Sequence, residues 1–166
     1  TGYDGIVGYV NDFYSYNPAT NTWAAINPFP GAGRSGAVAF AVGGKGYVGT
    51  GYNSSWLNNF YAYDPTTGNW TVIDTIPIVR ANAVGFGVGS KGYVGTGGNY
   101  WGYMDDFYEY DPATNHWTSK ATYPGGQVAE AAGFSISSSG KGYVGLGGQS
   151  MAGSNSFWEY NPTSNT

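Results

Sequence analysis

The chain repeats itself, and this repetition constrains the fold more than any other feature of the sequence. An aromatic-rich segment that runs into Asn-Pro or Asp-Pro and ends at a tryptophan occurs at residues 12–23, 59–70 and 106–117. Trp23, Trp70 and Trp117 are therefore each 47 residues apart, and a fourth copy at 156–166 stops where the next tryptophan is due. A second segment, Lys-Gly-Tyr-Val-Gly, recurs at 45–49, 91–95 and 141–145. A period of this length indicates an array of similar supersecondary units.

Each unit contains four short runs that are typical of β-strands. In the second unit these runs are 34–42, 45–49, 59–63 and 69–73. Gly43-Gly44 suits a tight hairpin because glycine tolerates positive φ, and Asp64-Pro65 is a turn former. No window of ten or more residues keeps a helical period. Four antiparallel strands in each unit are the signature of a propeller blade, so we expect an all-β fold.

The units divide one predicted segment, 1–166, into a partial unit at 1–30, full units at 31–77 and 78–124, and a partial unit at 125–166. With two, four, four and three strands, they make about three and a quarter four-stranded blades. The first run of each unit is rich in small residues, as expected of innermost strands around a crowded channel. The outer runs carry Phe, Tyr and Trp, and we expect Trp23, Trp70 and Trp117 to pack between blades.

An arc of this size would expose a hydrophobic blade face at each end, which favours aggregation. We therefore expect a partial ring. The chain is either a fragment of a longer protein whose remaining blades complete the propeller, or it associates with further copies of itself.

These residues resemble the Kelch repeat, a four-stranded β-propeller blade, of the kind found in secreted bacterial Kelch arrays. The family pattern has a Gly-Gly pair, supplied here by Gly97-Gly98 and Gly147-Gly148, and then an aromatic-rich strand, Asp/Asn-Pro-x-Thr and a tryptophan. An arginine follows, which is Arg34 or Arg80 in two units, whereas Val128 takes its place in the third. The resemblance covers essentially the whole chain and implies a Kelch-like propeller. It implies little about function, because one fold can host many activities.

Alternating strand direction places the loops after the second and fourth strands of every unit on one face. The loops after the second strand are long and differ between units, at 52–58, 99–105 and 149–155, and loops on a rigid scaffold are preferred binding sites. We predict a ligand-binding surface there. Its aromatic candidates, which could stack on a sugar or anchor a protein partner, are Tyr52, Trp56, Tyr100, Trp101 and Tyr103.

Three charged residues complete the candidate site. Arg34 and Arg80 open first strands near the channel mouth on this face and could grip a carboxylate bidentately. The alternative is that they pair with neighbouring Asp residues or backbone carbonyls. Glu130 lies two residues beyond the missing third arginine, so the rim is not uniformly positive.

The composition excludes several classes of function. The chain has no cysteine and one histidine, and its acidic residues show no EF-hand-like spacing, so we predict no catalytic residue, cofactor or metal site. Its net charge is −4 with no basic patch, which is atypical of nucleic-acid binding. No run approaches the roughly 18 apolar residues of a membrane span. Low charge with abundant Gly, Asn, Ser, Thr and Tyr resembles the composition of secreted bacterial Kelch arrays, and this resemblance implies an extracellular or cell-surface location.

Three functions follow as hypotheses. The preferred one is a non-catalytic module that recognises a protein or glycan ligand through its variable loops. The second is part of a carbohydrate-active or sugar-acid enzyme, an activity found among Kelch-like propellers, with its site outside this segment. The third is a structural protein that self-assembles through its open blade faces.

Overall fold

The computed structural model describes residues 1–149 and 152–166, and within these residues the chain forms strands and turns without a helix. The predicted all-β fold is confirmed. Residues 150 and 151 of the third variable loop lie outside the described residues. The part of the chain that is described holds no helix that could cross a membrane.

Two complete antiparallel sheets correspond to the two full units. The first contains β5 (Val38–Val42), β6 (Lys45–Gly49), β7 (Phe60–Asp64) and β8 (Asn69–Ile73) in that order. The second contains β9 (Val84–Val88), β10 (Lys91–Gly95), β13 (Phe107–Asp111) and β14 (His116–Lys120) in the equivalent order. The repeated runs in the sequence thus correspond to strands that pair with their neighbours along the chain.

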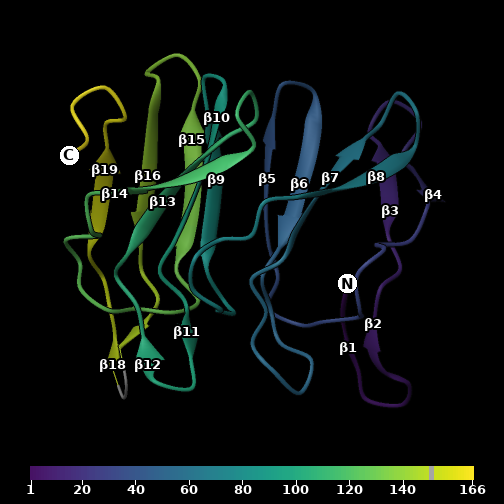
Figure 1. Cartoon of the computed structure of the whole chain (residues 1–166), viewed down its shortest axis with the longest axis horizontal. Coiled ribbons are helices and arrows are strands. Elements are labelled where there is room, and N and C mark those ends of the chain that lie inside the picture. The colour runs from purple at the N-terminus through teal and green to yellow at the C-terminus, as the bar shows by residue number, and fades with distance from the viewer. Residues whose placement is uncertain (150–151) are drawn as a thin grey trace.

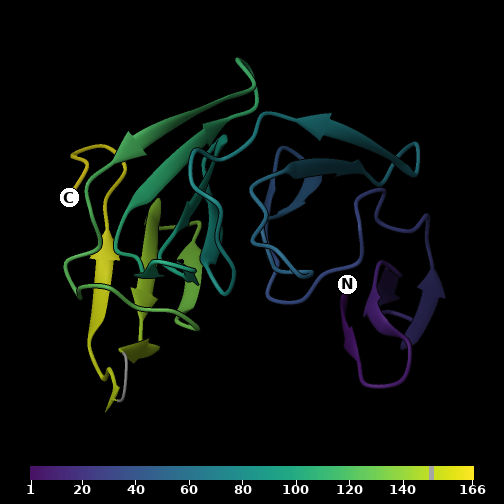
Figure 2. The ribbon, with the colours of Figure 1, turned by 60° about the horizontal axis from the view of Figure 1, so that its bottom comes forward.

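Smaller sheets lie at the two ends of the molecule. The first unit contributes β3 (Tyr14–Asn17) and β4 (Thr22–Ala25), and the last contributes β15 (Ala132–Ile136), β16 (Lys141–Gly145) and β19 (Phe157–Tyr160). The units follow one another in sequence order from one end of the molecule to the other (Figure 1, Figure 2).

The first strand of the second unit is shorter than the sequence suggested. Residues 34–42 were expected to be one strand, but β5 begins only at Val38. Gly36 adopts a φ of +59° and breaks the run. Ser35 instead exchanges backbone hydrogen bonds with Tyr52 in the following loop. The residues before the break therefore belong to the loop region and not to the sheet.

Neighbouring units are held together at their first strands. β9 packs against both β5 and β15. A Cβ at Gly87 would lie 2.1 Å from the carbonyl oxygen of Ala41, so only glycine permits the observed approach of β9 to β5. The expectation that small residues line the crowded strands is confirmed at this interface.

The larger core residues fill the space between units. One cluster joins the sheet of β5–β8 to aromatic residues of the next unit, and Phe40, Phe60, Tyr110 and Trp117 are among its members. The Phe60 and Trp117 rings are 4.9 Å apart, and Phe40 stacks on Tyr47 at 4.9 Å. Aromatic residues of successive units thus share one interior.

The three repeated tryptophans do not share one environment. Trp117 is 4% exposed, and its indole Nε1 donates to the Asp74 carbonyl at 3.0 Å. Trp70 donates in the same way to Asn27. Trp23 is 69% exposed, so the expectation that it packs between units is wrong. The reason is that Trp70 and Trp117 each lie against an aromatic ring of the preceding unit, whereas Trp23 lies against the Tyr16 ring of its own unit.

The buried tyrosines imply a loss of stability at alkaline pH. Burial raises the pKa of Tyr110 to about 12, with smaller contributions from Tyr47 and Asp74. The unfolded side chain ionises near pH 10. The stability from this group is therefore fully present below about pH 10 and is lost as the pH rises towards 12, because the unfolded state releases its proton first.

Tyr110→Phe should reduce this alkaline sensitivity. Between about pH 8 and pH 11 the wild type should lose about 1 kcal/mol more unfolding free energy than the variant. Urea titrations at the two pH values measure both losses. Tyr100→Phe, at a residue that is 79% exposed, is the control and should behave as wild type. Equal losses in Tyr110→Phe and wild type would contradict this prediction.

Candidate functional site

Short hairpins gather at one end of the molecule. They are β1–β2 (Gly2–Asp4, Gly8–Val10), β11–β12 (Gly98–Asn99, Gly102–Tyr103) and β17–β18 (Gly148–Gln149, Ala152–Gly153) (Figure 1). The turns that join β5 to β6 and β9 to β10 lie at the opposite end, as the alternation of strand direction predicts. We call the end formed by these hairpins and loop 50–58 the long-loop face.

No strand was expected in the segments that form these hairpins. In the first of them, Asp4 Oδ1 accepts the backbone N–H groups of Ile6 and Val7 at 2.7 and 3.0 Å. The same bonds lower the pKa of Asp4. In β11–β12, Gly102 takes a φ of +128°, which glycine adopts readily. Strands of two or three residues are too short for a period to reveal them in the sequence.

A row of six aromatic rings runs across the long-loop face and connects three units. Each ring meets the next edge to face, and we call the set the aromatic row. The centroid distances are 5.0 Å for Tyr3–Tyr9, 6.1 Å for Tyr9–Tyr52, 5.0 Å for Tyr52–Trp56, 6.3 Å for Trp56–Tyr100 and 6.3 Å for Tyr100–Trp101.

The row is exposed at its ends and anchored in its middle. Tyr100 and Trp101 are 79% and 81% exposed, whereas Tyr52 and Trp56 are half-buried. The backbone of Tyr52 is fixed by its two hydrogen bonds with Ser35. These observations describe a surface that is held in place by the scaffold and open to a ligand.

Asn99 positions the outer end of the row. Its side-chain Nδ2 donates to the carbonyl of Val79 at 2.9 Å, and its Oδ1 accepts the backbone N–H of Trp101 at 2.9 Å. One amide side chain thus ties the β11–β12 hairpin to the segment that precedes β9 and orders the backbone of the most exposed ring in the row.

The sequence identified four of the six rings and missed two. Tyr52, Trp56, Tyr100 and Trp101 were candidates, and the structure brings them together. Tyr3 occupies the repeat position of Tyr52, because Thr1-Gly2-Tyr3 matches Thr50-Gly51-Tyr52, so the repeat alone could have identified it. Tyr9 lies on the unpredicted β2 strand, which left no comparable signal.

Tyr103 lies beside the row and not within it. This residue is 41% exposed on β12 and pairs with Gly98 across the hairpin. A Cβ at Gly98 would meet the Tyr103 ring at 3.0 Å, so the ring lies over that glycine. We therefore assign Tyr103 to the support of the hairpin.

The two arginines are buried beneath this face. Both residues are 0% exposed, so neither offers a guanidinium to a ligand. Arg80 donates from Nη1 and Nη2 to the two carboxylate oxygens of Asp106, each at 2.7 Å, and from Nη1 to the Thr96 carbonyl. The structure corrects the prediction of an accessible anion site and shows the alternative, pairing with an aspartate and backbone carbonyls.

Arg34 occupies the same place in the preceding unit, where its side-chain partner is an amide. It donates to the Thr50 carbonyl at 2.9 Å and to Asn59 Oδ1 at 2.7 Å, and it lies over the Phe29 ring at 4.7 Å. Burial lowers the pKa of Arg34. In the last unit Val128 and Ser156 replace the arginine and its partner together.

Glu130 belongs to a second feature of this face, where the units meet. Gly36, Asn82 and Glu130 hold equivalent positions, and each has a φ between 57° and 59°. Asn82 N donates to the Gly36 carbonyl at 2.9 Å, and Glu130 N donates to the Asn82 carbonyl at 3.0 Å. Glu130 is exposed but links neighbouring units through its backbone instead of joining the aromatic row.

Comparison with known proteins supports the fold and leaves the function open. The chain aligns with the structure of YjhT at a TM-score of 0.78 and 21% sequence identity over 92% of this chain. The alignment spans 57% of the YjhT chain, so this chain corresponds to little more than half of that protein. The two proteins share a fold. No protein-family model and no curated protein matches the sequence.

Proposed function

We propose that the chain is part of a Kelch-like β-propeller that acts as a non-catalytic recognition module and binds a neutral glycan along the aromatic row. The propeller part of the proposal is supported by the repeated four-stranded sheets, whose first strands pack together between units. The order β14-β13-β10-β9 places the fourth strand on the far side of the sheet from that contact, which is the arrangement of a blade.

The aromatic row is the observation that carries the ligand proposal. Aromatic side chains offer a large, rigid apolar surface, which suits the apolar face of a sugar ring. Rings whose neighbouring centroids lie 5.0–6.3 Å apart extend this surface across three units. A chain of several sugar residues would use the row more fully than a single sugar would.

The charge of the face favours a neutral ligand. The segments that carry the row, 1–10, 50–58 and 96–105, contain Asp4 and Asp105 but no lysine or arginine. Arg34 and Arg80, which could have held a sugar carboxylate, are buried and bonded within the protein. These facts disfavour a sugar-acid site on this face, and the alternative of an enzyme places its site outside this segment. An extracellular or cell-surface location would suit the proposed role.

Loss of the exposed rings should weaken glycan binding. Trp101→Ala should reduce affinity for neutral linear oligosaccharides about tenfold, since an aromatic contact contributes about 1.4 kcal/mol. Trp56→Ala combined with Trp101→Ala should abolish measurable binding. Glycan arrays followed by calorimetry would measure both effects, and longer oligosaccharides should bind more tightly.

Trp23→Ala is the matched control, because Trp23 is 69% exposed but lies on β4 outside the row. Its affinity should equal that of the wild type. Undiminished binding by the double variant, or an equal loss in the control, would refute the proposal.

A further inference from the structure

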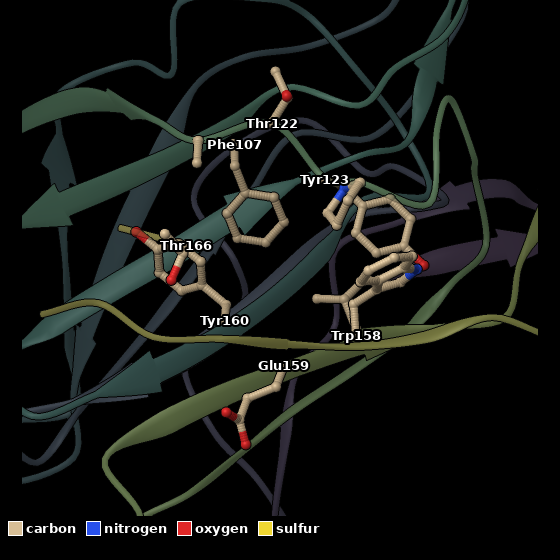
Figure 3. Close-up of a pocket in the computed structure, with 10 residues that line it drawn as sticks. Phe107, Thr122, Tyr123, Trp158, Glu159, Tyr160 and Thr166 are labelled. Carbon is tan, nitrogen blue, oxygen red and sulfur yellow. The ribbon is translucent and has the colours of Figure 1, made fainter. Parts of the chain in front are cut away.

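An apolar pocket lies between the sheet of β9–β14 and the last sheet, beside the end of the described chain (Figure 3). The hollow measures about 370 Å³ when the open solvent at its mouth is counted. Phe107 and Tyr160 line it from the two sheets, Ala121 and Tyr123 line it from the segment after β14, and Thr166 lies at its edge. The proposed glycan function uses none of these residues.

A tryptophan occupies the equivalent place in both earlier interfaces between units. Trp117 lies 4.9 Å from Phe60 and 5.0 Å from Tyr110, and its Nε1 donates to the Asp74 carbonyl. Trp70 lies 5.2 Å from Phe13 and 5.0 Å from Tyr63, and its Nε1 donates to the Asn27 carbonyl. Two flanking rings and one carbonyl therefore define each tryptophan site.

The pocket repeats both elements of these sites. Phe107 holds the repeat position of Phe60, Tyr160 that of Tyr110, and Ala121 that of Asp74. The Phe107 and Tyr160 rings are 5.9 Å apart. The third interface thus has the flanking rings and the carbonyl of a tryptophan site.

The turn that leads to the pocket is docked as in the earlier unit. Tyr160 Oη donates to Asn165 Oδ1 at 2.9 Å, as Tyr110 does to Asn115 at 2.8 Å. Asn165 Oδ1 also accepts the backbone N–H of Ala121 at 3.0 Å, which repeats the bond between Asn115 and Asp74. Asn115 and Asn165 have φ values of 52° and 57°. Trp117 lies two residues after Asn115, so the same geometry directs the position after Thr166 towards the pocket.

We propose that this pocket is a binding site for a tryptophan side chain carried by a strand that follows Thr166 and pairs with β19. Its indole would lie against Phe107 and Tyr160 and donate its N–H to the Ala121 carbonyl. The pocket continues the series of interfaces that Trp70 and Trp117 fill, and this series identifies its occupant.

Extending the chain tests the proposal. The segment 117–121, Trp-Thr-Ser-Lys-Ala, is added after Thr166, and the control carries the same extension with alanine in place of tryptophan. The tryptophan extension should raise Tm above that of the control by on the order of 5 °C. It should also slow amide hydrogen exchange in β19. Melting temperatures within about 1 °C of each other would overturn the proposal.

Nuclear Overhauser contacts locate the added ring. In the extended chain its indole protons should contact the ring protons of Phe107 and Tyr160. Stabilisation without these contacts would also overturn the proposal, because it would place the ring elsewhere. Glycan affinity should be the same in both extended chains, so the two proposals can fail independently.

Discussion

Gly92→Ala should lower the free energy of unfolding by about 3 kcal/mol, because it would force apart two units that meet at this glycine. A Cβ at Gly92 would lie 2.0 Å from the Phe40 ring of β5. Phe40 is 6% exposed and packs among Tyr47, Phe60 and Trp117, so it has little room to move. The cost arises from displacing an entire aromatic cluster.

Gly46→Ala is the matched control in the preceding unit. Gly46 holds the same position of the Lys-Gly-Tyr-Val-Gly segment, but a Cβ there would meet nothing within 4 Å. Alanine should leave stability unchanged or raise it by about 0.5 kcal/mol, since it reduces the entropy of the unfolded chain. Gly142→Ala, where a Cβ would lie 2.2 Å from the Phe86 ring, should resemble Gly92→Ala. Equal denaturant midpoints for Gly92→Ala and Gly46→Ala would contradict this account.

Asp106→Ala should cost about 3–5 kcal/mol of unfolding free energy, because it leaves the buried Arg80 guanidinium without its counter-charge. Arg80 is 0% exposed and makes two 2.7 Å bonds to Asp106. Arg80 also donates to the Ile78 and Thr96 carbonyls. Removal of the Asp106 carboxylate should therefore also disturb the segments that contain Ile78 and Thr96. Urea unfolding monitored by circular dichroism would measure the change.

The equivalent pair in the preceding unit supplies the reciprocal experiment. Asn59 accepts from Arg34 where Asp106 accepts from Arg80. Asn59→Asp should stabilise the protein by roughly 1 kcal/mol, because an ion pair replaces the bond from the buried Arg34 cation to a neutral acceptor. Asp106→Asn should destabilise it, but less than Asp106→Ala does. A destabilising Asn59→Asp would show that the cost of burying a second charge exceeds the gain from pairing.

Much of the candidate site followed from the sequence, because the repeat separates constant positions from variable ones. Tyr52, Trp56, Tyr100 and Trp101 stood out as aromatic residues in loops that differ between units. Their contact with one another could not be predicted, since it depends on how closely the units approach. The prediction that Arg34 and Arg80 are accessible to a ligand was wrong for a related reason. Their acceptors, Asn59 and Asp106, lie about 25 residues away in the sequence. Only the fold brings each acceptor to its buried guanidinium.

The sequence by itself determined the four main strands of each full unit apart from the start of the first, their order within the unit and the end of the molecule at which the variable loops lie. These properties are local: alternating strand direction and turn-forming residues specify them without reference to neighbouring units. The tertiary structure decided what depends on packing between units: the burial of Trp117 and the exposure of Trp23, the pairing of Arg80, the aromatic row and the pocket that repeats the tryptophan sites. A residue in a repeat has a similar local sequence in every unit, but its environment is set by which units lie beside it.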